Sequence, residues 1–322
     1  MNMKLDNYIQ TFELLKRNLK WKVSDKRILM TISSIYVLNG KTLDVDRFLQ
    51  LADAIQSRAS LFSPLRSYSR FTTAAMLDVK FENPEDKIEE LFQLYDLFRE
   101  EKFSSGVFTY IAATILLTNE QKNSKATIQL TKEIYDGMKK EHSFLTTSSD
   151  YPLATLLALE SRSNIISHIE SFYDELAKHG FRKGNDLQFL SHILALEKDA
   201  SKNVLINRVI QVMDSFVTSG IRAKPMYYPF IGMLALLPQE EYKVAPVLSL
   251  YEELNNQKDF KWYKEMNLMM AASFFVNEKT EQKGLAETSL STILEAILQA
   301  QQAVMIATVA ATAAASSSSS GN

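Results

Sequence analysis

The chain has no cysteine, which excludes disulfide bonds, thiolate metal sites and a cysteine nucleophile. Its nine glycines and seven prolines are few for 322 residues, and strict alternation of apolar and polar residues is rare, which favours helix over sheet. Positive and negative charges nearly cancel, to a formal net charge of −2. No global field therefore draws the chain to nucleic acid or to an anionic membrane, and we expect neither as a partner.

Motifs that carry known chemistry are missing as well. The sequence contains no glycine-rich phosphate loop, no His-Glu-x-x-His pair and no nucleophile elbow. His192 lies in an apolar segment, where we expect a core residue and not a ligand. The first 20 residues mix acids into their apolar pattern, which is unlike a signal peptide or a membrane span. We therefore expect no catalytic residue, no cofactor, no metal and a cytoplasmic location.

The sequence is organised around a recurrence. The segment FYDELAKHGF at residues 172–181 has counterparts from one end of the chain to the other. The residues that close the copies are 41, 41, 37, 40 and 39 positions apart, and they are Phe62, Phe103, Phe144, Phe181, Ile221 and Phe260. Self-similarity at such a period is typical of stacked two-helix repeats.

Each repeat combines two helices of different character. The first, such as YPLATLLALE at 151–160, is apolar over most of its circumference, so we expect an inner helix that is buried on two sides. The second, which holds Ile165, Ile169 and Phe172 in one copy, is amphipathic and is expected outside. We predict an all-α fold, an α-solenoid (α/α superhelix) of about seven helical hairpins with a period of 37–41 residues. Residues 1–300 are expected to form a single helical-repeat domain, and 301–322 an alanine-rich terminal helix with a serine-rich disordered tail.

An acidic residue stands at the third position of every copy. The six are Asp53, Asp96, Asp136, Asp174, Asp214 and Glu252. Because a repeat array must reuse its contact between units at every joint, we interpret them as joint acids that accept from the next unit, for example from Arg182, Arg222 or Lys261. A functional acidic stripe is the alternative.

Basic residues gather at the turns that lead from a second helix to the next first helix, and acids gather at the opposite turns. If the hairpins stack in register, one edge is basic and is a candidate binding surface. Its residues are Lys20, Lys22, Arg182, Lys183, Arg222, Lys224, Lys261 and Lys264. The basic run at 16–27 surrounds Trp21, a combination that can bind phosphate and stack a base. We favour the simpler interpretation that Trp21 packs a joint between helices.

Three features together resemble a known family. They are the repeated hydrophobic-Tyr-Asp/Glu pattern, the segment LFSPLRSYSRFTTAAMLD at 61–78, and the alanine-rich end with its serine tail. The family is a bacterial one, the domain of unknown function numbered four thousand and three, and the resemblance covers nearly the whole chain. It implies a bacterial cytoplasmic setting and transfers no activity or site residue. More loosely, the hairpins resemble tetratricopeptide or HEAT repeats.

The sequence does not establish a function. The leading hypothesis is a cytoplasmic helical-repeat scaffold that binds another protein or a peptide along a concave face or the basic edge. The alternative is an enzyme, a closed α/α toroid that acts on a carbohydrate-like substrate through acidic residues. Short connections between the helices weigh against the enzyme, because such sites are often carried by long loops. The ligand, the biological process, the oligomeric state and the open or closed form of the array are left undecided.

Overall fold

The computed structural model describes residues 2–119, 123–198, 200–237 and 242–282. These residues form fourteen α-helices, four short 3₁₀ helices and no strand, which confirms the all-α prediction. The predicted terminal helix and tail at 301–322 lie outside the described residues. No helix among the described residues is both long enough and apolar enough to cross a membrane.

The helices alternate between an amphipathic and an apolar kind. The odd-numbered helices are the amphipathic ones: α1 (Asn2–Leu19), α3 (Val45–Arg58), α5 (Lys87–Glu100), α7 (Ser124–Glu141), α9 (Ile165–Lys178), α11 (Lys202–Thr218) and α13 (Val244–Asn256). The even-numbered helices are the apolar ones: α2 (Lys26–Leu38), α4 (Ser69–Lys80), α6 (Val107–Thr118), α8 (Tyr151–Glu160), α10 (Asn185–Ala195), α12 (Tyr228–Leu236) and α14 (Lys264–Gln282). Every residue of α12 is buried, whereas α9 buries only one stripe.

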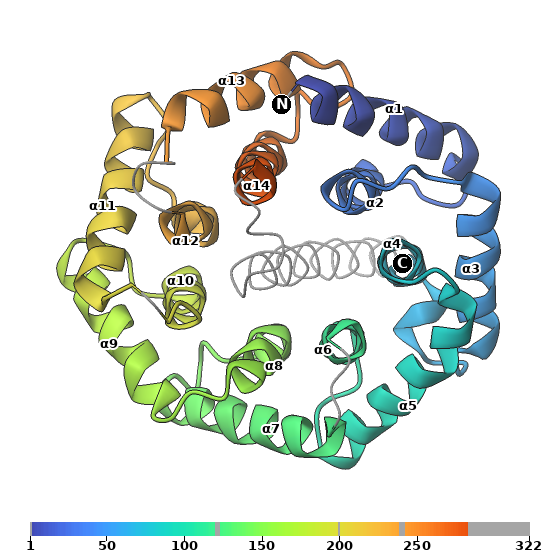
Figure 1. The fold of residues 1–322 in the computed structure, drawn as a ribbon, viewed down its shortest axis with the longest axis horizontal. Helices are drawn as coiled ribbons and strands as arrows, with labels where there is room; N and C mark the ends of the chain where they lie inside the picture. The colour runs from blue at the N-terminus through green and yellow to red at the C-terminus, as the bar shows by residue number, and fades with distance from the viewer. Residues whose placement is uncertain (1, 120–122, 199, 238–241, 283–322) are drawn as a thin grey trace, which may run out of the picture. The chain divides into compact units, whose positions relative to one another are not determined.

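The chain divides into two compact units. Residues up to Ile128 belong to unit 1 and the described residues from Gln129 onward to unit 2, so the boundary falls inside α7. Within unit 1, α1, α3 and α5 form one layer and α2, α4 and α6 the other (Figure 1). Within unit 2, α9, α11 and α13 form one layer and α8, α10, α12 and α14 the other (Figure 1). The single domain over 1–300 stays a prediction.

Each odd-numbered helix packs on the even-numbered helix that follows it. This holds for α1 with α2, α3 with α4 and α5 with α6, and equally for α9 with α10, α11 with α12 and α13 with α14. Tyr135 of α7 packs on Tyr151 of α8 with ring centroids 4.8 Å apart. The hairpin therefore begins with the amphipathic helix, and α1 is the first member of a complete pair.

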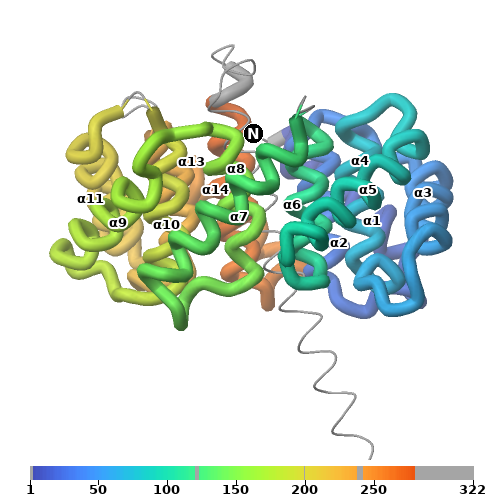
Figure 2. The backbone as a smooth tube through the Cα atoms, turned by 90° about the horizontal axis from the view of Figure 1, so that it is seen from below, coloured from blue at the N-terminus to red at the C-terminus, as the bar shows by residue number. Residues whose placement is uncertain are grey.

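The two kinds of connection lie at opposite edges of each unit. Within each unit taken by itself, the connections from an odd-numbered to an even-numbered helix lie at one edge and the return connections at the other (Figure 2). This follows from antiparallel hairpins that stack side by side in chain order, as α4 does between α2 and α6, and α10 between α8 and α12. Small residues allow close packing of neighbours, because a Cβ atom on Gly232 of α12 would lie 2.7 Å from Cδ1 of Leu190 on α10.

Three of the predicted closing residues end their helices in the same way. The backbone N–H of Phe103 donates to the carbonyl of Phe98 at 3.1 Å, and the preceding residue, Lys102, has a φ of 65°. Phe181 and Ile221 repeat this six-residue closure after glycines with positive φ. The arrangement is the Schellman motif, in which the residue after the left-handed one packs back on the last helical turn. Phe103 accordingly lies 4.9 Å from Phe98, ring to ring.

Two other closing residues do not close a hairpin. Phe62 and Phe144 are 94% and 97% exposed, so neither packs back on its helix as Phe103 does. No residue with positive φ precedes either of them. After α3 it is Ala59 that is buried, in extended backbone, and after α7 the buried residue is Thr146.

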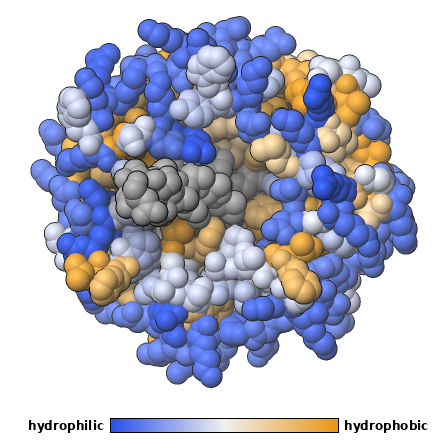
Figure 3. Space-filling view, turned by 180° about the vertical axis from the view of Figure 1, so that it is seen from behind, coloured by the Kyte–Doolittle hydropathy of each residue, from blue (hydrophilic) through white to orange (hydrophobic). Residues whose placement is uncertain are grey.

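The surface seen from behind, in Figure 3, is mostly hydrophilic, with small separate groups of apolar residues.

Tyrosines of the odd-numbered helices contribute to the joints. Tyr95 on α5 stacks on Tyr110 of α6 with ring centroids 3.9 Å apart, and its hydroxyl accepts a hydrogen bond from the backbone N–H of Gly106. Tyr173 on α9 accepts from the backbone N–H of Gly184 in the same way. Both glycines directly precede an even-numbered helix, so each tyrosine satisfies a donor at a helix start that has no partner within its own helix.

Candidate functional site

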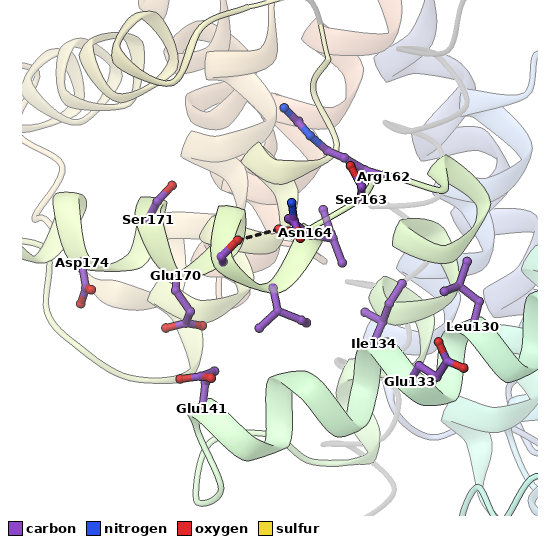
Figure 4. A pocket seen from close by; sticks show the side chains of 13 residues that line it. Leu130, Glu133, Ile134, Glu141, Arg162, Ser163, Asn164, Glu170, Ser171 and Asp174 are labelled. Atoms are coloured by element: carbon purple, nitrogen blue, oxygen red, sulfur yellow. Dashed lines mark hydrogen bonds between the residues drawn. The ribbon is translucent and has the colours of Figure 1, made fainter.

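A groove runs between α7 and α9 on the amphipathic side of unit 2 (Figure 4). Its volume is about 860 Å³. The α7 side presents Leu130, Glu133, Ile134 and Glu141, which recur at helical spacing on one face. The other side comprises the start and one face of α9 with the turn before it, and it presents Arg162, Ser163, Asn164, Ile165, Ile166, Ser167, Glu170, Ser171 and Asp174.

The two helices approach most closely at Gly137. A Cβ atom on this residue would lie 2.7 Å from Cγ1 and 2.9 Å from Cδ1 of Ile166. Glycine is therefore what allows Ile166 to lie directly against the α7 backbone. With Leu130, Ile134 and Ile165, Ile166 gives the groove an apolar floor.

Carboxylates line the rims above this floor. Glu133, Glu141, Glu170 and Asp174 face a single lining cation, Arg162, which gives four negative charges against one positive charge. Glu141 and Glu170 extend toward one another from opposite sides (Figure 4). Among the described residues, Glu133, Glu141 and Asp174 take part in no ion pair.

Glu170 is the most enclosed of the four carboxylates. It lies 2.9 Å from Nε2 of His142, whose ring packs 4.4 Å from that of Tyr173. Burial raises the pKa of the Glu170 carboxyl; His142 opposes this rise, and the neighbouring charges of Glu141 and Asp174 reinforce it. The rim therefore concentrates negative charge that its own residues neutralise only in part.

Sequence reasoning missed this groove. The available signal was Gly137, because the copy IYDGMKKEHSF has glycine where the copies ending at Phe181 and Phe260 have glutamate after the repeated acid. An isolated glycine in a helical pattern points to close approach of another backbone or side chain. Of the predicted site residues, only Asp174 lines the groove.

The eight residues of the predicted basic edge all lie at or beside connections from odd-numbered to even-numbered helices. They are Lys20 and Lys22 in unit 1, and Arg182, Lys183, Arg222, Lys224, Lys261 and Lys264 at three successive connections of unit 2. Seven are exposed, and Lys224 is half-buried and pairs with Glu265 at 3.5 Å. Their role in binding stays a prediction.

Trp21 does not pack a joint, and that prediction is wrong. Its side chain is 91% exposed, because Leu19 and Val23 on either side of it fill the space under the turn. The ammonium of Lys20 lies 5.1 Å from the centre of the indole ring.

The six repeated acids are all exposed on odd-numbered helices. Asp136 pairs with Lys132 of its own helix. The charge of Asp53 acts on Arg70 in α4, the next helix. The role of the whole set as joint acids stays a prediction, whereas the tyrosines beside Asp96 and Asp174 make the contacts between helices described above.

Two buried polar clusters lie outside the groove. In unit 1, the carboxylate of Asp78 is 1% exposed and accepts from the Tyr36 hydroxyl at 2.6 Å, while Lys41 and Arg47 pair with its other oxygen at 3.2 and 3.1 Å. This cluster ties α2, α3 and α4 together. Each side chain in it has a partner within the cluster, which is the arrangement of a structural site.

In unit 2, His192 of α10 is fully buried, as the sequence predicts, with Nδ1 4.0 Å from a carboxylate oxygen of Asp150. Burial lowers the pKa of His192 to about 3 and raises the pKa of Asp150 to about 6. The N–H of Thr147 donates to Asp150 at 2.9 Å. Within the ranges that the structure describes, no three histidine, aspartate or glutamate side chains are arranged to hold a metal ion.

Comparison with known proteins places the chain in a family. No solved structure matches it. It is 38% identical over 307 residues to the uncharacterized protein YeaA of Bacillus subtilis (strain 168), and this match covers 94% of the chain and 93% of YeaA. The model of the family described as protein of unknown function (DUF4003) matches residues 11–303. The chain therefore belongs to the bacterial family of proteins of unknown function DUF4003.

Proposed function

We propose that the chain is a helical-repeat binding protein that holds a basic, amphipathic peptide segment of a partner protein in the groove between α7 and α9. The observation that supports this most is the combination of an apolar floor with four carboxylates on the rims. An amphipathic helix that enters a groove needs both features, since its apolar stripe contacts the floor and its flanking cations meet the rims.

The dimensions suit a short helix. From Leu130 to Glu141 the α7 side spans twelve residues, and the eleven steps of about 1.5 Å between them give about 16 Å, or three helical turns. Three turns present about three apolar side chains on one face, each of which contributes about 1.5–3 kcal/mol when fully buried. Exposed ion pairs with the rims add less, about 0.2–1 kcal/mol each, and mainly select for a basic partner.

The bacterial cytoplasm is the proposed location, in keeping with a chain that has no cysteine. The alternative of an enzyme acting on a carbohydrate-like substrate stays a prediction. The groove supports binding more directly, because its three carboxylates without an ion pair lie beside an apolar floor that can contact the apolar stripe of a helix.

Binding of a fluorescent Lys/Leu peptide of about 14 residues, designed as an amphipathic helix, tests the proposal by anisotropy. Reversal of the three unpaired rim charges, E133K/E141K/D174K, is expected to weaken binding at least about tenfold at low salt. The effect should shrink as salt is added, because exposed charges are screened.

The matched control is D96K/D214K/E252K, which reverses three exposed acids on other odd-numbered helices and changes the net charge equally. It should bind the peptide as the unmodified chain does. Equal loss in both variants would mean that the peptide responds only to net charge, and no loss in the rim variant would exclude the groove.

A further inference from the structure

Exposed aromatic side chains occur at one kind of place in this fold. Among the described residues, the aromatic side chains that are exposed are Trp21, Phe62, Phe144 and Trp262, at 91%, 94%, 97% and 80%. Each lies in a connection from an odd-numbered to an even-numbered helix, after α1, α3, α7 and α13. The return connections carry no exposed aromatic residue among those that the structure describes. Both tryptophans of the chain are in this group.

The fold gives no reason for these rings to be where they are. Aromatic side chains bring the largest apolar areas to a core, and an aromatic residue in a connection can fold back as Phe103 does. Phe144 and Trp262 instead extend from the edge of unit 2, and Trp21 and Phe62 extend from the same kind of edge in unit 1. Scattered apolar residues are ordinary on a protein surface, but aromatic side chains that recur beside cations along one edge are typical of contact with the membrane–water interface.

The edge of unit 2 that carries Phe144 and Trp262 is strongly basic. Its connections with the adjoining helix ends, residues 139–147, 178–184, 219–225 and 257–265, contain ten Lys or Arg and three Asp or Glu, a net charge of +7. The opposite connections, 160–164, 196–202 and 237–243, contain four Lys or Arg and five Asp or Glu, a net charge of −1. The near-neutral charge of the whole chain averages over this difference.

Cations also stand directly beside the aromatic tips. The ammonium of Lys261 lies 5.1 Å from the ring centre of Trp262, and Lys20 lies at the same distance from Trp21. Lys139 and Lys140 precede Phe144 by one helical turn and are exposed. An indole or phenyl ring flanked by lysines is the combination found at the interface between a membrane and water.

We propose that this edge docks on the surface of an anionic lipid bilayer, with the aromatic tips at headgroup depth and the Lys and Arg side chains against lipid phosphates. Phe144 and Trp262 lie in the first and fourth connections of unit 2, so three helix spacings of about 8–10 Å, or about 24–30 Å along the edge, separate them. Protein interfaces typically have one contiguous apolar centre, whereas separate apolar tips with cations between them match an extended, uniformly negative surface.

Intrinsic tryptophan fluorescence tests this directly, because both tryptophans lie at such edges. The full chain is titrated with vesicles of phosphatidylcholine alone and with vesicles that also contain phosphatidylglycerol. With anionic vesicles, we expect the tryptophan emission to shift to the blue and the protein to sediment with the vesicles, and both effects should weaken as salt is added. With neutral vesicles, we expect neither effect. A W21F variant, in which Trp262 is the single reporter, should keep the shift.

Two variants with substitutions at exposed residues test whether vesicle binding depends on this edge of unit 2. F144S/W262S and R182E/K183E/R222E should each reduce vesicle binding at least tenfold, with helix content and thermal midpoint unchanged because the side chains are exposed. V204S and K202E/K243E, at the opposite end of the helices, are the controls for the apolar and the charge substitutions and should bind as before. K202E/K243E changes the net charge by about −4, against about −6 for R182E/K183E/R222E. F62S repeats the test for unit 1.

Three results would overturn the proposal. They are equal binding to neutral vesicles, no binding to anionic vesicles, and binding that survives both edge variants. A protein partner that is retained by the unmodified chain and lost from F144S/W262S, without any vesicle binding, would assign the edge to a protein and likewise overturn it.

Discussion

The buried carboxylate of Asp78 gives the sharpest test of the packing in unit 1. Its oxygens are held by the Tyr36 hydroxyl at 2.6 Å on one side and by Lys41 and Arg47 on the other. Burial and the charge of Asp78 both raise the pKa of Tyr36, so its hydroxyl remains a donor to the carboxylate. We choose Tyr36→Phe and Asp78→Asn because both keep the shape of the side chain.

The expected loss of stability in each variant follows from the burial of the groups that it leaves unpaired. Tyr36→Phe removes one hydrogen bond to a charged acceptor, which lowers the free energy of unfolding by about 1.5–3 kcal/mol. Asp78→Asn leaves two cations without their counter-charge. Because Lys41 and Arg47 are 33% and 37% exposed and can turn toward water, we expect the free energy of unfolding to fall by about 2–3 kcal/mol, less than a broken pair of two fully buried charges costs.

Urea unfolding followed by circular dichroism measures both variants and their combination. The double variant should lose less than the sum of the two by about 1 kcal/mol, since Tyr36→Phe removes and Asp78→Asn weakens the same charge-assisted hydrogen bond. Tyr68→Phe, at a half-buried hydroxyl, is the control and should change little. Strict additivity of Tyr36→Phe and Asp78→Asn, or a loss below about 0.5 kcal/mol for either, would refute the described geometry.

Three further predictions concern single positions. Gly137→Ala should destabilise the chain by about 1–2 kcal/mol, and adding Ile166→Ala should recover part of this in urea unfolding, because both close contacts belong to the isoleucine. Lys102→Gly should raise the free energy of unfolding by about 0.5–1 kcal/mol, because Lys102 has a φ of 65°. Burial lowers the pKa of His192 to about 3 and raises that of Asp150 to about 6, so as pH falls from 6 to 4 the first group removes stability and the second adds it. His192→Leu leaves only the second effect, and its unfolding free energy should rise relative to the unmodified chain by about 1.4 kcal/mol per pH unit; parallel pH profiles would contradict this.

The helices and their two kinds of face could be predicted from sequence because periodicity reports burial directly. Ile165, Ile169 and Phe172, predicted as one stripe, are buried in α9. The pairing of helices could not be predicted in the same way. The repeated pattern does not show which of its two helices begins a hairpin. An apolar helix could pair with the amphipathic helix before it or after it, and the closeness of packing between their surfaces determines which.

The closing residues show where pattern alone fails. Phe181 and Phe144 stand at equivalent positions in their copies, yet the first is buried and the second is 97% exposed. The difference lies in the backbone before them, since Gly180 has a φ of 85° and turns the chain back on the helix, whereas Ser143 does not have positive φ. Both are large apolar side chains, and the conformation of the residue before each one determines whether the ring packs on the helix or extends into solvent.

The groove and the exposed aromatic tips are properties of neighbouring hairpins, so single-copy reasoning could not assemble them. The carboxylates of Glu141 and Glu170 belong to different helices that only packing brings face to face (Figure 4). Gly137 was the one residue whose identity pointed to this contact.

Because the chain has no cysteine, a single introduced thiol can report on the groove, and this is the most direct test of the proposed binding function. Ser171→Cys places an environment-sensitive dye in the groove, and Ser215→Cys on α11 is the control, with similar exposure outside it. On titration with the basic amphipathic peptide, we predict a saturable change in emission at position 171 and none at 215. Equal responses at both positions, or none at 171 while the peptide binds, would contradict the assignment of the groove as the binding site.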